Sequence, residues 1–151
     1  MKLSHSFSRS LSRRIAIALL AGTALITVTA QAASYKVIVN NSVSINSLSK
    51  KAASDLFLKK TTKWEGGAAV LPVDQVDSSN TRDGFSRSIH GKPTAAVKSY
   101  WNQQIFSGRE VPPVEKKSDA EVLAFVRSTP GAIGYVSDAT SVDGVRVVAV
   151  N

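Results

Sequence analysis

The feature that most constrains this sequence is the stretch Val70–Ile89, where an apolar run leads through a polar turn into a helical pattern. The apolar residues 68–73 are typical of a buried strand, and residues 77–80 are of types that favour turns and helix caps. Beyond the turn, Phe85 and Ile89 stand four residues apart, as on one face of a helix. A strand, a short polar loop and a first helical turn predict a site where backbone N–H groups and a helix dipole face an anion.

The side chains of this loop also suit an oxyanion. Ser79 and Thr81 supply hydroxyls, and Arg82 supplies a cation in the first turn of a helix expected to begin at Thr81. The helix dipole favours acidic residues there, so the position of Arg82 indicates a negative ligand. The structural alternative stays open: Ser78 or Ser79 caps the helix, Asp83 complements the dipole, and Arg82 is solvated.

The loop SSNTRDGF resembles the Ser-Gly-Thr-x-x-x-Phe loop of phosphate-binding proteins from ABC transporters. Further segments that resemble this family stand in the same order and cover nearly all of the chain after Ala33; the most specific are WEGG at 64–67 and PGAIGYV at 130–136. The others are 48–49 with 55–57, 70–73, and 100–101 with 106–108. The resemblance implies a periplasmic solute-binding protein of the type 2 periplasmic binding fold, which delivers phosphate to an ABC permease.

Loop and resemblance together define a candidate oxyanion site. Its expected ligands are Ser78, Ser79, Asn80, Thr81 and Arg82, with Asn41, Ser42 and Gln75 as additional candidates. Two positions depart from the family pattern. Asn80 stands where glycine is usual, so the backbone approaches an anion less closely. Gln75 stands where an upstream arginine would pair with phosphate, so a bidentate charge is missing.

Length limits the function that the resemblance implies. Family phosphate binders close two lobes on their ligand, whereas this chain corresponds to about one lobe, residues 33–151. We therefore expect phosphate or a related oxyanion to bind weakly, in association with ABC-type uptake. The alternative is a non-transport interaction or sensing module that kept the fold, lost the ligand and contacts another periplasmic protein. A homodimer that rebuilds a cleft also stays open.

The N-terminus predicts export. Lys2 and three arginines precede the apolar run Ile15–Val28, and Ala30 and Ala32 form an A-x-A cleavage site. This is the pattern of a cleavable signal peptide, residues 1–32, and it predicts a periplasmic protein. Its removal lowers the net charge from +8 to +4, because all four of its charged residues are basic.

Composition excludes several partners and scaffolds. Lysine pairs such as Lys50-Lys51 are scattered without interleaved aromatic residues, so we expect no nucleic-acid binding. The chain has no cysteine, and therefore no disulfide framework. About 119 residues suffice for one core without such crosslinks.

Catalysis has little support in the residues. His90 is the only imidazole after the signal peptide, and we expect it as a favourable cation at a helix C-terminus. A triad with Ser78 or Ser79 would have to span roughly 13 Å of helix. We therefore expect a binding protein rather than an enzyme, with no cofactor and no metal.

The remaining patterns predict the architecture. Tyr35–Val39 predicts a central strand, because consecutive apolar residues suit burial on both faces. We further expect a helix capped near Asn46 or Ser47, helices from Thr94 and from the capping box Ser118–Glu121, and strands over 132–136 and 145–150. The order β-α-β-α-α-α-β-β predicts an α/β, three-layer-like sandwich around a mixed central sheet.

The expected core is drawn from the buried faces of these elements. It contains Phe57, Phe85, Trp101, Phe125, Ile133 and Val148, and we expect Val97 and Ile105 on the buried face that carries Trp101. Trp64 is expected to cover one edge of this core.

Overall fold

The computed structural model describes residues 34–151, so the predicted signal peptide lies outside the described residues. The strands are β1 (Tyr35–Val39), β2 (Ser47–Leu48), β3 (Leu71–Gln75), β4 (Val114–Lys116), β5 (Ala132–Ser137) and β6 (Arg146–Val150). The helices are α1 (Lys50–Phe57), α2 (Asn80–Phe85), the π-helical turn η1 (Ser86–His90), α3 (Thr94–Phe106) and α4 (Asp119–Ser128). None of these helices is long and apolar enough to span a bilayer.

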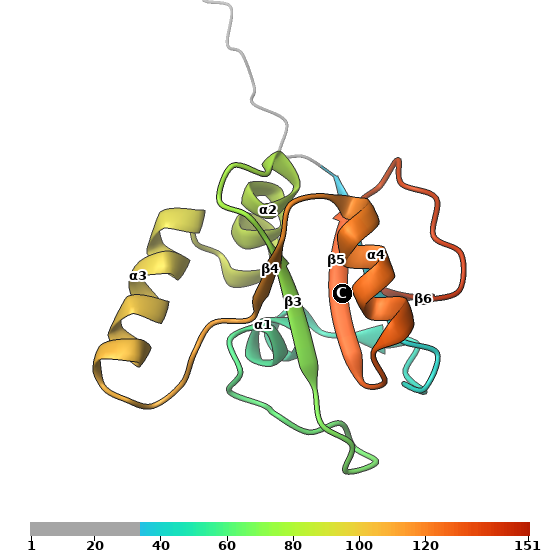
Figure 1. Cartoon of the computed structure of the whole chain (residues 1–151), viewed down its shortest axis with the longest axis horizontal. Coiled ribbons are helices and arrows are strands. Elements are labelled where there is room, and N and C mark those ends of the chain that lie inside the picture. The colour runs from blue at the N-terminus through green and yellow to red at the C-terminus, as the bar shows by residue number, and fades with distance from the viewer. Residues whose placement is uncertain (1–33) are drawn as a thin grey trace, which may run out of the picture.

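The strands form one mixed sheet in the order β2-β6-β1-β5-β3-β4. β1 lies inside it, as predicted, and pairs antiparallel with β5 and β6. β3 runs parallel to β5 and to β4. Figure 1 shows β3, β4 and β5 side by side in front, with α2 above the end of β3.

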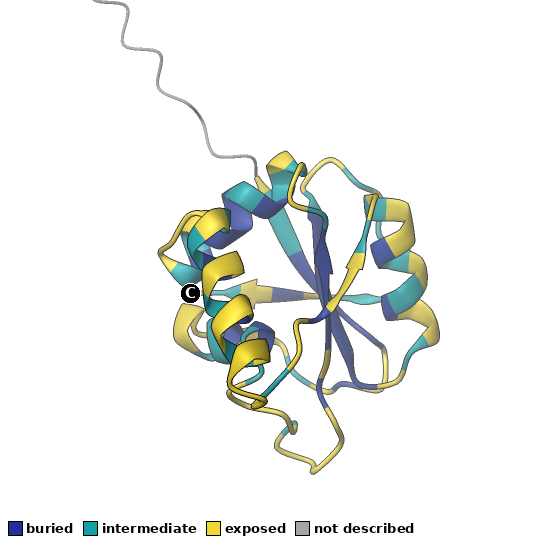
Figure 2. Cartoon of the chain, turned by 60° about the vertical axis from the view of Figure 1, so that its left-hand side comes forward, coloured by how far each residue is buried: buried dark blue, intermediate teal, exposed yellow. Residues whose placement is uncertain are grey.

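Helices cover both faces of the sheet, which confirms the predicted three-layer α/β sandwich (Figure 2). Alternating side chains of β1 decide which layer each residue joins. Val37 and Val39 pack with residues of α1, α2 and η1, whereas Ile38 packs with Val122 and Val126 of α4.

The sheet therefore divides the core that the sequence predicted as one. Phe57, Phe85, Ile133 and Val148 share the larger cluster. Phe125 is half-buried and packs against the α4 cluster on the other face. Trp101 is buried on α3, but its predicted neighbour Ile105 is 51 % exposed, because α3 packs on η1 with only part of its length.

Two short strands explain the other differences from the expected elements. Ser47 and Leu48 pair with β6, so α1 begins later than predicted and is capped by Ser49, whose Oγ accepts the N–H of Ala52 at 3.1 Å. β4 was not predicted and pairs with the second half of β3, which ends at Gln75 rather than Val73. Polar residues 74 and 75 thus belong to the sheet.

The two most specific segments of the sequence contact each other. Trp64 is half-buried against the larger cluster, as expected, and its Nε1 donates to the carbonyl of Gly131 at 2.9 Å. Gly131 has a φ of 78°, and a Cβ there would lie 2.3 Å from the carbonyl oxygen of Ala69. Only glycine fits this close approach between segments 64–69 and 130–131.

Candidate oxyanion-binding site

The predicted loop connects β3 to α2, and Ser79 is its helix cap. The Ser79 Oγ accepts the N–H of Arg82 at 3.2 Å, and the Ser79 carbonyl accepts the N–H of Asp83 at the same distance. The helix therefore starts at Asn80, one residue before the predicted Thr81. Its length is only six residues before the turn widens into η1.

The hydroxyl of Ser79 is also engaged as a donor. It donates to Oε1 of Gln75 at 2.5 Å, and Gln75 in turn donates from Nε2 to Asp119 at 2.8 Å and to the carbonyl of Tyr135 at 3.1 Å. Gln75 is buried at 3 % exposure. At the position where the family resemblance implies a ligand-binding arginine, this chain instead has an amide that ties the loop to α4 and β5.

Arg82 is buried at 4 % exposure, so the alternative of a solvated arginine is wrong. Its guanidinium lies 2.6 Å from Glu115, 3.0 Å from Asp77 and 3.2 Å from Asp74, and it also donates to the carbonyl of Gln75. A guanidinium needs carboxylate or carbonyl partners when it leaves water. The protein's own groups supply them here.

The ion-pair cluster carries a net negative charge. Asp74, Asp77 and Glu115 face Arg82, and Lys98 adds a second cation 2.7 Å from Asp77, which leaves three carboxylates to two cations. Burial lowers the pKa of Arg82, but Asp74 and Glu115 outweigh it, so the pKa is raised overall. Arg82 is therefore permanently charged, and the carboxylates of the protein already neutralise its charge.

Asp74 is the most enclosed carboxylate of the cluster. Burial raises its pKa, although Arg82 and the hydroxyl of Tyr135, which donates to Oδ1 of Asp74, oppose the shift. The hydrogen bond from Lys98 lowers the pKa of Asp77 at the surface. The cluster thus joins β3, β4, β5 and α2 around a single guanidinium.

The outer part of the loop remains open to an anion. Ser78 and Asn80 are exposed and Thr81 is half-buried. Within residues 34–151 the backbone N–H groups of Asn80 and Thr81 have no hydrogen-bond partner. These two N–H groups and the hydroxyls of Ser78 and Thr81 are among the donors that the loop offers to solvent.

Asn41 and Ser42 lie at the other end of the sheet, so the structure does not bring them to the loop. β1 runs antiparallel to β5 and β3 runs parallel to it, so β1 ends beside the start of β3. A five-residue strand separates these ends by roughly 17 Å. Ser42 instead accepts the N–H of Gly131 at 3.1 Å, and Asn41 donates to the carbonyl of Gly144 at 3.3 Å.

His90 differs from expectation in its charge. Burial, followed by Arg82, Lys60 and Lys92, lowers its pKa to about 4, so the imidazole is neutral at pH 7 rather than a helix-terminal cation. Its Nδ1 lies 2.8 Å from Oγ of Ser54. The sequence did not indicate this serine–histidine pair, because the two residues are 36 positions apart on separate helices.

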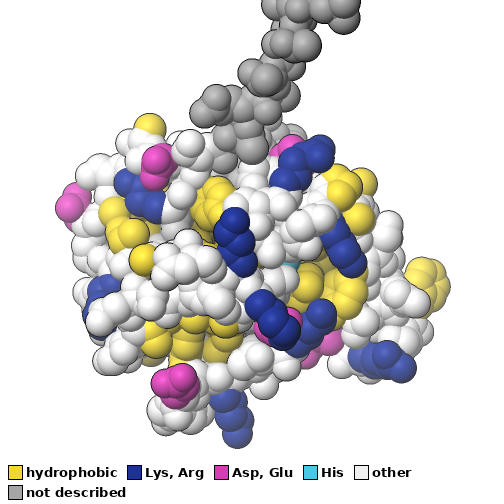
Figure 3. Space-filling view, turned by 180° about the vertical axis from the view of Figure 1, so that it is seen from behind, with side chains coloured by type: hydrophobic (Ala, Val, Ile, Leu, Met, Phe, Trp, Pro, Cys, Tyr) yellow, Lys and Arg dark blue, Asp and Glu magenta, His cyan; other side chains and the backbone are white. Residues whose placement is uncertain are grey.

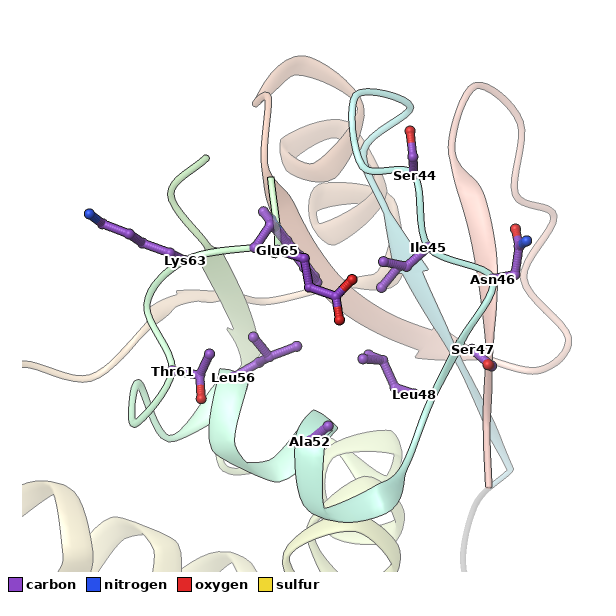
Figure 4. Close-up of a pocket in the computed structure, with 11 residues that line it drawn as sticks. Ser44, Ile45, Asn46, Ser47, Leu48, Ala52, Leu56, Thr61, Lys63 and Glu65 are labelled. Carbon is purple, nitrogen blue, oxygen red and sulfur yellow. The ribbon is translucent and has the colours of Figure 1, made fainter. Parts of the chain in front are cut away.

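Two hollows open near the start of β3, away from the loop. They measure about 470 and 620 Å³ and share the lining residues Ser44, Ile45, Trp64 and Glu65. Figure 4 shows Ile45, Leu48 and Leu56 directed into the first hollow from different segments, with Lys63 pointing away from it. The linings mix polar and apolar residues, and Lys63 is the one basic residue among them, so the hollows offer no cation cluster for an oxyanion.

Comparison with solved structures defines the class of fold. Neither a family model nor a curated protein matches the chain. The described fold is nevertheless similar to about half of the fold of solute-binding proteins of ABC transporters, which confirms at the level of fold the resemblance to one lobe stated from the sequence.

The solved structures that superpose on this chain include two proteins named for phosphate transport. An ABC-type phosphate transport receptor from Vibrio cholerae superposes with a TM-score of 0.61 at 16 % identity, over 78 % of this chain and 46 % of that one. A putative phosphate ABC transporter substrate-binding protein with bound phosphate from Clostridium perfringens superposes with a TM-score of 0.61 at 22 % identity, over 78 % of this chain and 45 % of that one. PstS from Borrelia burgdorferi superposes with a TM-score of 0.54 at 15 % identity, over 80 % of this chain and 49 % of that one. This chain thus matches about half the length of each.

Proposed function

We propose that this protein is a periplasmic solute-binding-like protein that holds phosphate or a related oxyanion weakly and is associated with ABC-type phosphate uptake. The observation that carries the proposal is the pair of unpartnered N–H groups at Asn80 and Thr81, beside the hydroxyls of Ser78 and Thr81. They follow β3 in the loop that resembles the family's phosphate loop. The fold shared with a phosphate-bound protein of this class supports the same assignment.

The geometry argues for weak binding. Arg82 is engaged by three carboxylates, and both hydrogen-bonding roles of Ser79 are used within the protein. An anion on the loop therefore meets neutral donors next to a cluster of net negative charge. Hydrogen bonds to a charged ligand contribute roughly 1.5–3 kcal/mol each, and association itself costs at least about 4 kcal/mol. Three such bonds therefore leave at most about 5 kcal/mol, which corresponds to a dissociation constant in the millimolar range or weaker.

Amide chemical shifts test the proposal. Phosphate is titrated at pH 7 and constant ionic strength, with sodium chloride as the balancing salt, while ¹H–¹⁵N spectra follow residues 77–83. We expect the signals of Asn80 and Thr81 to move saturably in the millimolar range. Signals that stay still at about 50 mM phosphate, a concentration well above that range, would contradict oxyanion binding on the loop.

A second candidate, an interaction or sensing module, is favoured by a different observation. The hollows at Ile45 and Trp64 have partly apolar linings, and elsewhere on the surface the apolar side chains of Phe106 and Val111 are 94 % and 60 % exposed. Figure 3 shows that hydrophobic side chains also reach the surface in patches bordered by lysine and arginine. Apolar patches of this kind are typical of surfaces that contact another protein. The same phosphate titration separates the two candidates.

A further inference from the structure

A small cavity with basic walls lies between α1, η1 and α3, at the opposite end of the α2–η1 helix from the loop. Its volume is about 130 Å³. Ser54, Lys60, His90 and Lys92 supply its polar lining, and Leu58, Val97 and Tyr100 supply the rest. At about 30 Å³ for each water molecule in the liquid, it holds the equivalent of roughly four waters. That space accommodates a small oxyanion of five heavy atoms.

The charges around this cavity are unbalanced. None of its lining residues is acidic. The carboxylate of Asp55 lies 4.0 Å from Lys60 but pairs at 2.5 Å with Lys51. Lys92 has no ion pair among residues 34–151. Lys60 and Lys92 therefore line one concave space, and in the described part of the chain the only carboxylate paired with either of them is that of Asp55, which Lys60 shares with Lys51.

The hydrogen bonds among the residues that line the cavity leave some donors free for a ligand. The Tyr100 hydroxyl is committed to the carbonyl of Leu58 at 3.2 Å. The Ser54 Oγ is 2.8 Å from Nδ1 of His90, and when the serine donates this bond the proton of a neutral imidazole resides on Nε2. The ring edge opposite Ser54 then presents an N–H donor, and Lys60 and Lys92, which line the same cavity, are close enough to act on the charge of the ring.

We propose that this cavity is a binding site for a small tetrahedral oxyanion such as sulfate or phosphate, held by Lys60, Lys92 and the imidazole of His90. The site is separate from loop 77–83 and does not depend on the function proposed for that loop. Its ligand would meet cationic donors, whereas a ligand on the loop would meet neutral donors.

Binding at this site is coupled to a proton. The charged groups that act on His90 are Arg82, Lys60 and Lys92, all of them cations, while Ser54 and the ring of Phe85 are its neutral neighbours. A bound dianion offsets this repulsion and raises the pKa of His90. If that pKa rises from about 4 to about 6, sulfate binds about tenfold more tightly at pH 5 than at pH 8. Sulfate is the suitable probe, because its own charge does not change over this range.

The experiment follows the His90 ring signals of the full-length chain by NMR, in sodium sulfate and in sodium chloride of equal ionic strength. His5→Gln assigns the second imidazole. We expect sulfate to raise the pKa of His90 and the apparent affinity to increase about tenfold between pH 8 and pH 5. His90→Gln should bind sulfate with no such pH dependence. A His90 titration curve that is the same in both salts would overturn the proposal.

Matched lysine variants locate the site. Lys92→Ala removes a wall of the cavity, and Lys63→Ala removes the same charge from an exposed loop outside it. We expect Lys92→Ala to weaken sulfate binding at least about fivefold and Lys63→Ala to leave it nearly unchanged, as for a direct charge-assisted contact. Equal effects of the two variants would mean general charge attraction and would contradict the assignment. Amide shifts confined to Asn80 and Thr81 would likewise reject this site while supporting the loop.

Discussion

The guanidinium of Arg82 lies 2.6 Å from the carboxylate of Glu115, although the two residues are 33 positions apart and sit on α2 and β4. Asp74 and Asp77 also pair with Arg82, so the guanidinium is occupied by carboxylates of the protein and holds the structure together instead of binding a ligand. It explains why the loop can carry the family's hydroxyl pattern and still offer only neutral donors to an anion.

The buried ion pair predicts a large stability effect. Arg82→Ala leaves Asp74 buried without its cation, so we expect the free energy of unfolding to fall by about 3–5 kcal/mol in denaturant melts. Arg87→Ala is the matched control, because Arg87 forms an exposed i,i+4 pair with Asp83 and should change stability by less than about 1 kcal/mol. Similar losses of unfolding free energy in both variants would show that the ion pairs of Arg82 are not buried.

Aromatic packing gives a second prediction. Phe85 is buried and stacks on Tyr135, with ring centroids 3.9 Å apart. Phe85→Ala should cost roughly 3–5 kcal/mol of unfolding free energy. Phe106→Ala, at a side chain that is 94 % exposed, should change it by less than about 0.5 kcal/mol. The ratio of these two effects, measured in one denaturant series, checks the assignment of core and surface.

The pKa of His90 predicts a pH dependence of stability. The folded-state value is lowered to about 4 from an ordinary 6.5, so the unfolded chain binds the proton more tightly. The contribution of His90 is therefore complete above pH 6.5 and is lost as the pH falls toward 4. In chloride buffer, unfolding free energy should drop by about 2–3 kcal/mol more in the wild type than in His90→Gln between pH 7.5 and 4.5. Parallel pH profiles would show that the imidazole is solvated.

Export remains a prediction from the N-terminal sequence. Cleavage after Ala32 should yield a secreted chain that begins at Ala33, because the charged start, apolar run and A-x-A pattern direct processing there. Mass spectrometry of a periplasmic extract measures the N-terminus directly. A full-length product retained in the membrane fraction would contradict this reading.

The layers of the fold and the position of the loop could be predicted from local patterns, because helices, strands and turns depend mainly on residues that are neighbours in the sequence. Ser79 caps a helix where the change from apolar run to polar turn indicated one. The partners of Arg82 were not predictable in this way. Glu115 reaches it from β4, a three-residue strand too short to leave a periodic pattern. Ser54 and His90 likewise meet only through the packing of α1 on η1.

Asn41 and Ser42 show why a site cannot be assembled from composition alone. Both are polar residues at a strand end, which made them reasonable candidates. Whether that end meets the loop depends on the direction of β1 relative to β3, and strand direction is set by pairing through β5. The structure places the end of β1 and the end of β3, where the loop begins, at opposite ends of the sheet.

The central claim is that backbone N–H groups at the start of α2 hold the oxyanion. Asn80 occupies the first helical position, where proline removes the N–H yet suits the helix, and Ser79 already has the extended conformation that proline requires before it (φ −75°, ψ 124°). Asn80→Ala is the matched control, because it removes the same side chain and retains the N–H. ³¹P line widths of inorganic phosphate measure binding in this affinity range. Our account predicts that Asn80→Pro weakens phosphate binding at least about fivefold relative to Asn80→Ala, since one charge-assisted hydrogen bond is lost. Equal binding by the two variants would contradict it.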